Sequence, residues 1–220
     1  MRREKLPRLA YSESAARATC AEKDDRELML ELRGGDELAL DELMTRKTQA
    51  LVQFVFRMLG DREEARDVTQ LTFFKVWQKR LDYNPRFTPN TWIYRIATNL
   101  SIDLLRSRRS REASSDSLTH HFRQVGLRQF NKDISRLTKD EVHAIFLQLA
   151  EYLTAKQRVI FILREVEGRS SGEVAQILGC RESTVRNHLF NARKVLRGEL
   201  MRLYPEYVPE HLRGAEVRSP

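Results

Sequence analysis

The fold is decided by one stretch of the sequence, SSGEVAQILGCRESTVRNHLFNARKVL, which spans residues 170–196. Ser170 followed three residues later by Glu173 predicts a capping box that begins a helix. Gly179 suits the left-handed conformation that ends such a helix. A second helix is expected from about Arg181, because apolar residues then recur on one face at spacings of four, three and four: Val185, Leu189, Ala192 and Leu196. Two helices joined by a tight turn, with the small Ala175 at their crossing, predict a helix-turn-helix.

The outward face of that second helix is rich in hydrogen-bond donors and positive charge. Between Arg181 and Arg202, six basic side chains accompany only two acidic ones, Glu182 and Glu199. Amide and guanidinium groups bind base edges in the major groove, and cations bind phosphates. A solvated helix in an ordinary bundle is the alternative, but the cap, the turn and the basic face together favour DNA recognition. The expected DNA contacts are Arg181, Ser183, Thr184, Arg186, Asn187, Phe190, Asn191 and Lys194.

The composition of the whole chain predicts a soluble, all-α protein. Of its 220 residues, 41% are hydrophobic and 32% charged, and the net charge of +8 favours a polyanionic partner. No apolar run approaches the roughly 20 residues that span a bilayer, and the N-terminus lacks a signal peptide's apolar region. Two cysteines, Cys20 and Cys180, are too few for a disulfide framework or a thiolate zinc site, so we expect a cytoplasmic protein without metal or cofactor.

Breaks in composition predict two small helical domains joined by a flexible basic linker. Residues 1–24 mix charge with small polar residues and are expected to be a mobile extension. Helical domains are expected at residues 25–111 and 140–204, with the linker at 112–139 and a proline-bearing tail at 205–220. Inside the first domain, the helix breaks fall at residues 33–36, 60–61 and 84–90, where glycine, asparagine and proline gather.

One helix of the first domain is apolar on two sides. Asp61 and Glu64 predict its start, and its core-facing stripe consists of Ala65, Val68, Phe73, Val76 and Trp77. Leu71 and Phe74 fall on the opposite side, together with Asp67, Gln70 and Gln78. Such a helix is either fully buried or binds a partner protein, and in so small a domain the second interpretation is favoured.

The segment NTWIYRIATNLSIDLLRSRRSR, residues 90–111, predicts an amphipathic helix with a polar outer face. Its inward residues are Ile93, Ile96, Ala97, Leu100 and Leu104, and its outward residues are Arg95, Asn99, Asp103 and Arg106. The basic cluster Arg108, Arg109 and Arg111 follows and suits phosphates. The alternative is an exposed face stabilised by Asp103 with Arg106, a pair worth a few tenths of a kcal/mol. Aromatic residues around the preceding loop can stack on bases drawn from a duplex: Tyr83, Phe87, Trp92 and Tyr94.

Three segments together resemble the sigma factor family, specifically its extracytoplasmic-function branch. They are ARDVTQLTFFKVW, TWIYRIATNLSIDLLR and LTAKQRVIFILREVEGRSSGEVAQILGCRESTVRNHLFNARKVL, in matching order and separation. The resemblance implies that the first domain binds the clamp of core RNA polymerase and reads and melts the promoter element nearer the start site. It implies that the second domain binds the farther element of promoter DNA, that an anti-sigma protein holds the chain inactive, and that the chain is not an enzyme.

Position by position, the resemblance assigns roles to the candidate residues. It implies a clamp contact at Asp67, Gln70, Leu71 and Phe74. It implies near-element contacts at Asn84, Arg86, Phe87, Arg95, Asn99, Asp103 and Arg106, with the loop 84–91 capturing a flipped base. The far-element contacts are those of the second helix above. Leu71 departs from the family by standing where an acidic residue is usual, and Asn191 stands where a basic one is frequent.

Two other classes of protein are alternatives to a sigma factor. A helix-turn-helix regulator that is not a polymerase subunit explains residues 140–204 but leaves the outward Leu71 and Phe74 unexplained. A DNA-processing enzyme such as a recombinase requires a nucleophile or clustered metal-binding carboxylates, and no convincing constellation of either is present in the sequence.

Overall fold

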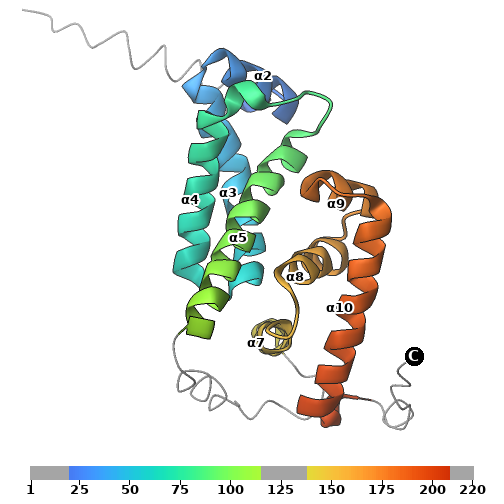
Figure 1. Cartoon of the computed structure of the whole chain (residues 1–220). Coiled ribbons are helices and arrows are strands. Elements are labelled where there is room, and N and C mark those ends of the chain that lie inside the picture. The colour runs from blue at the N-terminus through green and yellow to red at the C-terminus, as the bar shows by residue number, and fades with distance from the viewer. Residues whose placement is uncertain (1–19, 115–137, 209–220) are drawn as a thin grey trace, which may run out of the picture.

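A computed structural model describes residues 20–114 and 138–208, and all regular structure in these ranges is helical (Figure 1). The first half, residues 20–114, contains α2 (Asp25–Gly34), α3 (Glu37–Leu59), α4 (Arg62–Gln78), the 3₁₀ turn η1 (Arg80–Asp82) and α5 (Pro89–Ser114). The second half, residues 138–208, contains α7 (Lys139–Ala150), α8 (Ala155–Phe161), the π-helical turn η4 (Ile162–Val166), α9 (Ser171–Leu178), α10 (Glu182–Leu203) and the 3₁₀ turn η5 (Pro205–Tyr207). The predicted all-α class is confirmed.

The breaks at 33–36 and 60–61 separate α2, α3 and α4 as the sequence predicts, whereas α4 ends at Gln78, before the predicted break at 84–90. Asp36 and Asp61 cap α3 and α4 by accepting hydrogen bonds from the backbone N–H groups of Leu38 and Glu64. Gly60 ends α3 with a φ of 79°, a left-handed conformation that glycine adopts without a steric penalty. Local chemistry therefore determines these boundaries.

The ends of the described ranges pack more closely than their composition suggests. Residues 20–24 fall in the expected N-terminal extension, yet Cys20 is buried and Arg46 donates hydrogen bonds to the carbonyl oxygens of Cys20, Ala21 and Lys23. Near the other end, Tyr207 and Val208 of the expected tail are buried as well. Residues 1–19, 209–220 and most of the expected linker, 115–137, lie outside the described residues.

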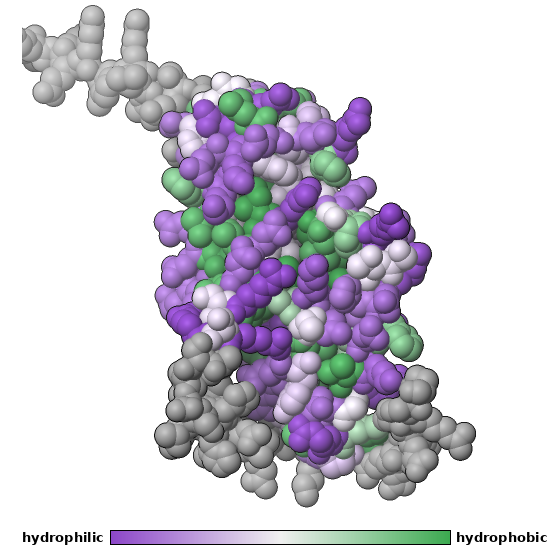
Figure 2. All heavy atoms as spheres, in the orientation of Figure 1, coloured by the Kyte–Doolittle hydropathy of each residue, from purple (hydrophilic) through white to green (hydrophobic). Residues whose placement is uncertain are grey.

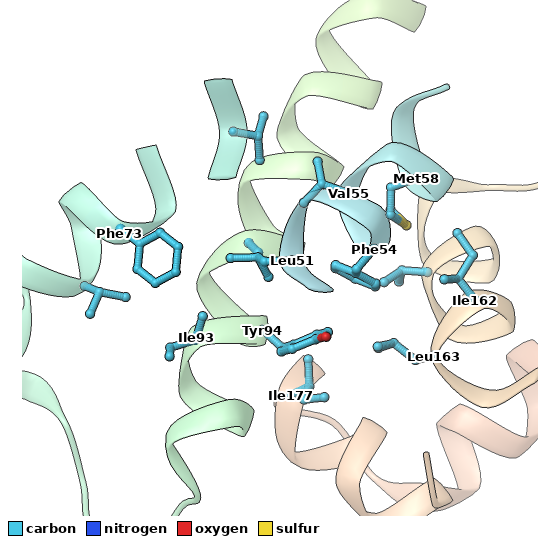
Figure 3. Packing of buried hydrophobic residues seen from close by; sticks show 14 of the residues in the cluster. Leu51, Phe54, Val55, Met58, Phe73, Ile93, Tyr94, Ile162, Leu163 and Ile177 are labelled. Carbon is cyan, nitrogen blue, oxygen red and sulfur yellow. The ribbon is translucent and has the colours of Figure 1, made fainter. Parts of the chain in front are cut away.

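One apolar core extends through both halves (Figure 3). It includes Leu51, Phe54 and Met58 of α3, Phe73 of α4, Ile93 and Tyr94 of α5, Ile162 and Leu163 of η4, and Ile177 of α9. A smaller cluster lies within the second half alone and contains Ile145, Leu149, Leu153, Ala192, Leu196, Tyr204 and Tyr207. The two halves therefore pack directly on each other, with α8 and α9 against α5.

The face shown in Figure 2 is mainly hydrophilic, and hydrophobic patches appear between its polar side chains. Within the two described ranges, no helix combines the length and the apolar character that crossing a membrane requires. A few large apolar side chains remain exposed there, and three of them, Leu71, Phe74 and Phe190, are predicted contact residues.

Candidate polymerase and nucleic-acid interfaces

Helix α4 presents its two large apolar residues to solvent. Ala65, Val68, Phe73 and Val76 are buried, and Trp77 is half-buried, as their spacing predicts. On the opposite side, Leu71 is 42% exposed and Phe74 is 59% exposed, with Asp67 and Gln70 exposed beside them. The alternative of a fully buried helix is therefore excluded, and this face is available to a partner.

The loop before α5 is held by its own hydrogen bonds. The buried Tyr83 donates its hydroxyl hydrogen bond to the carbonyl oxygen of Phe87 at 2.9 Å, and its ring lies 5.4 Å from that of Trp92. Burial raises the pKa of Tyr83. Asn84 Oδ1 accepts a hydrogen bond from the backbone N–H of Arg86 at 3.0 Å. Both Asn84 and Arg86 are exposed and Phe87 is half-buried, so Tyr83 serves the core while the loop's polar residues face outward.

The polar face of α5 is arranged as predicted, but the buried face is wider. Arg95, Asn99, Asp103 and Arg106 are all exposed. Ile93 and Ala97 are buried and Ile96, Leu100 and Leu104 are half-buried, while further buried residues not expected from the apolar pattern are Tyr94, Thr98, Ser101 and Ile102. The packing of α8 and α9 against α5 contributes to this widening, and Tyr94 is covered in this way, with the guanidinium of Arg169 against its ring.

Two arginines of the basic cluster after this helix are held by protein groups. Arg108 forms an ion pair with Glu64 and donates a hydrogen bond to the carbonyl oxygen of Leu59 at 3.1 Å. Arg109 Nη2 donates to the carbonyl oxygens of Glu151 and Leu153 in the second half, at 2.8 and 2.7 Å. Both guanidinium groups therefore bind protein groups in this arrangement, whereas the sequence predicts that they bind phosphates.

The helix-turn-helix forms as its local chemistry predicts. Ser170 caps α9 in a full capping box with Glu173, whose carboxylate accepts a hydrogen bond from the Ser170 N–H at 2.8 Å. Hydrogen bonds from Ser170 lower the pKa of Glu173. Gly179 adopts a φ of 62°, and α10 then begins after Arg181, which makes no side-chain cap. The buried residues of the two helices are Val174, Ala175 and Ile177 of α9 and Val185 and Leu189 at the start of α10.

All eight DNA-contact candidates on and just before α10 are exposed: Arg181, Ser183, Thr184, Arg186, Asn187, Phe190, Asn191 and Lys194. Phe190 is 68% exposed, an unusual position for a phenylalanine without a partner. Two side-chain contacts on this face are long, at 3.4 Å between Arg186 Nη1 and Glu182 and 3.5 Å between the amides of Asn191 and Asn187. Contacts of that length are weak, so these groups remain available to DNA.

A buried arginine lies where the two halves meet, and no local pattern predicted it. Arg158 of α8 is 8% exposed, and its Nε has no hydrogen-bond partner among the described residues. Burial lowers the pKa of Arg158 to about 10, Glu151 opposes the shift, and Arg108 and Arg109 add to it. Three positive side chains therefore crowd this end of the contact between the halves.

One group of possible metal ligands occurs among the described residues. The ligand atoms of Cys20, Glu31 and Asp36 lie within 4.8 Å of one another. Glu31, however, accepts a hydrogen bond from the Lys23 ammonium at 2.5 Å, so its negative charge is already balanced by an ion pair. This arrangement does not change the expectation that the chain acts without a metal.

Two family models match the chain in the expected order. The model described as Sigma-70 region 2 matches residues 43–111, and the one described as Sigma-70, region 4 matches residues 143–196. Together they span more than half of the chain, and they contain every candidate contact residue named above.

Relatives match over almost their whole lengths. The RNA polymerase sigma-H factor of Pseudomonas aeruginosa is 29% identical over 189 residues, covering 84% of this chain and 98% of the relative. The ECF RNA polymerase sigma factor SigW of Bacillus subtilis is 27% identical over 180 residues, covering 77% of this chain and 93% of the relative.

Two solved structures share the fold. The structure of CnrH in complex with the cytosolic domain of CnrY has a TM-score of 0.59 and 24% identity, over 81% of this chain and 97% of that one. The sigma factor RpoE in complex with the anti-sigma factor NepR from Bartonella quintana has a TM-score of 0.54 and 22% identity, over 74% and 97%. With both sigma-70 regions in order and near full-length similarity to such factors, the chain belongs to the extracytoplasmic-function sigma factors of bacterial RNA polymerase.

Proposed function

We propose that the two halves of this sigma factor divide its work as their exposed faces suggest. Helix α4 binds core RNA polymerase through Leu71 and Phe74, flanked by Asp67 and Gln70. The loop 84–91 and the outer face of α5 read and open the near promoter element. Helix α10 reads the far element from the major groove through its eight exposed candidates. The chain thereby selects promoters and starts transcription of a stress- or signal-responsive set of genes.

The exposed apolar face of α4 carries this proposal. A protein that only binds DNA gains nothing from exposing a leucine and a phenylalanine one turn apart, because each costs hydration free energy in water. In a complex, the same two side chains supply the apolar centre that stable interfaces require. A helix-turn-helix regulator outside the polymerase leaves that face without a purpose.

We also propose that the chain works in the cytoplasm and that an anti-sigma protein controls it. The complexes of CnrH with CnrY and of RpoE with NepR support such a partner, since both share this fold. The cytoplasmic location follows from the need to meet polymerase and DNA.

The function is tested by transcription from a promoter library. Core polymerase is mixed with duplexes randomised upstream of a fixed transcript, with and without the full chain, and transcribed templates are sequenced. We expect two separated sequence elements to be enriched only when the chain is present. A chain that binds duplexes alone and adds no transcripts is a regulator of another kind, and the proposal then fails.

The docking face is tested by a pair of matched variants. Leu71→Asp with Phe74→Ala should reduce association with core polymerase at least tenfold, since it places a charge in an apolar contact. Phe190→Ala removes another exposed phenylalanine, from the other half, and should retain core association while weakening promoter binding. Circular dichroism checks that both variants are folded. Equal core affinity of the wild type and the double variant would remove the basis for docking through α4.

A further inference from the structure

One acidic side chain lies among the DNA-contact candidates of α10. Glu182 is the first residue of the helix, between Arg181 and Ser183, and its side chain is 54% exposed. A carboxylate on this face repels the phosphates of DNA and lowers affinity for every sequence alike. A carboxylate in the first turn also stabilises its own helix, but Glu182 has two further neighbours outside that turn.

The carboxylate of Glu182 faces both α9 and Arg186. Arg186 Nη1 donates a hydrogen bond to its Oε2 at 3.4 Å. Its Oε1 lies 3.2 Å from the point where a Cβ on Gly172, the second residue of α9, would sit. The positive end of α9 therefore attracts one carboxylate oxygen while the other accepts from Arg186. The helix-turn-helix brings these groups together, since α9 and α10 pack on each other (Figure 1).

This contact orients a side chain proposed to read a base. Glu182 is the one hydrogen-bonding partner of the Arg186 side chain among the described residues. An arginine identifies guanine with two N–H donors directed at O6 and N7, so recognition depends on the orientation of the guanidinium plane. At 3.4 Å the pair is long and only biases that orientation in water, but bound DNA excludes water and strengthens the attraction. With Nη1 turned to Glu182, Nη2 and Nε remain to donate to the base.

We propose that Glu182 is a positioning residue for Arg186 and that, through it, Glu182 determines the preference of α10 for guanine at one base pair of the far element. Glu182 thereby lowers affinity for DNA in general and raises discrimination among sequences. The inference rests on the proposed far-element role of α10 and adds a residue that determines its specificity. Two other roles make different predictions. If Glu182 instead accepts from the amino group of a cytosine, its loss adds to that of Arg186, and if it only stabilises the helix start, base preference does not change.

Holoenzyme assembled from core polymerase and the full chain tests this inference with the promoter library. Arg186→Ala first identifies the base pair whose preference depends on that arginine. We expect Glu182→Ala to reduce discrimination at the same base pair about fivefold, because the guanidinium loses its preferred orientation. The same variant should bind scrambled duplexes about twofold more tightly, because a carboxylate that repels phosphates is removed. A loss of helix stability alone gives neither this gain in affinity nor a loss confined to one base pair.

Matched variants separate orientation from charge. Glu182→Gln retains an oxygen that accepts from Arg186 and removes the charge, so it should bind scrambled duplexes as tightly as Glu182→Ala and lose less discrimination. Glu199→Ala removes the same charge near the other end of α10, where Glu199 pairs with Arg202, and should leave discrimination unchanged. In the double variant of Glu182→Ala with Arg186→Ala, discrimination should equal that of Arg186→Ala alone, because both residues act through one base contact. Circular dichroism checks that every variant is folded.

Unchanged discrimination in Glu182→Ala would overturn the inference, as would losses from Glu182→Ala and Arg186→Ala that add in the double variant. If Arg186→Ala relaxes no base pair, the inference fails together with the base contact of Arg186, and the proposed function stands. A library from which the wild-type chain enriches no element is a failure of the proposed function itself, and the inference fails with it.

Discussion

We expect two arginines of α10 to make different contacts with DNA: Arg186 with base edges and Arg197 with phosphates. Both are exposed, but Arg186 lies in the first turns of the helix, where side chains enter the major groove, and Arg197 lies three turns later. We expect Arg186→Ala to cost about 1–3 kcal/mol of binding to the selected far element and much less on other sequences.

Arg197→Ala should weaken binding to all sequences alike and reduce the slope of log affinity against log salt by about one unit. Salt titrations of holoenzyme binding to specific and scrambled duplexes distinguish the two effects. If both variants change specificity and salt slope in the same manner, the assignment of base and phosphate contacts along α10 is wrong.

We expect substitution of two glycines by alanine to change the free energy of unfolding in opposite directions. Gly179 has a φ of 62°, and a Cβ there would meet Arg95, whereas Gly198 lies within α10 with nothing within 4 Å of an added Cβ. Gly179→Ala should lower the free energy of unfolding by about 1–2 kcal/mol, the cost of a left-handed conformation with a Cβ. Gly198→Ala should raise it by about 0.5–1 kcal/mol, because glycine loses more backbone entropy in a helix. Urea unfolding measures both, and a stabilising Gly179→Ala would contradict the role of this turn.

At the scale of an element, the loop before α5 carries the exposed side chains proposed to contact the near element and also the start of a helix. Thr88 Oγ1 accepts a hydrogen bond from the Thr91 N–H at 3.1 Å, and Pro89 begins the helix. Replacing the whole loop would therefore remove a cap worth about 0.5–2 kcal/mol as well as the exposed side chains. The informative replacement is of residues 84–87 alone, by a glycine-serine segment.

We expect that replacement to leave association with core polymerase intact and to abolish transcription from duplex promoters. Drawing a base out of a duplex costs a few kcal/mol, so its capture site matters most at the opening step. A pre-melted template should recover much of the lost activity, and a fluorescent base analogue in the near element reports unstacking directly. Opening at the wild-type rate in the altered protein would show that the loop has no part in melting.

For the whole molecule, we expect His143 to make the contact between the halves sensitive to acid. Its ring lies 4.7 Å from the ring of Phe56 across that contact, and its buried Nε2 has no hydrogen-bond partner among the described residues. Burial lowers the pKa of His143, with Arg57, Arg158 and Arg62 adding to the shift and Asp140 opposing it. The folded chain therefore favours neutral imidazole.

As pH falls below about 6.5, the unfolded chain takes up this proton before the folded chain does, so stability is lost. The contribution is fully present above that pH. His143→Phe retains a ring against Phe56 and cannot be protonated, so its free energy of unfolding should fall less than that of the wild type between pH 7.5 and 5.5. Urea unfolding at the two pH values measures this, and parallel losses in both proteins would rule out His143 as the group responsible.

The sequence alone determined most of what is local. Capping pairs such as Ser170 with Glu173, the glycines that end α2, α3 and α9, and the 3.6-residue period together predict the helices and the faces that turn outward. Leu71, Phe74 and the polar face of α10 were found in this way because their signal lies within one helix. The family resemblance followed from the same segments.

Only the tertiary structure decided which helix surfaces are buried between the two halves and which side chains bind across that contact. The burial of Tyr94, the position of Arg158, the engagement of Arg108 and Arg109 and the packing of Tyr207 all depend on residues distant in the sequence. Helical periodicity reports which face of a helix is apolar, but not whether a second domain covers a further part of it. Such contacts arise from the shapes of two surfaces and the closure of the chain between them, and no pattern within one segment contains that information.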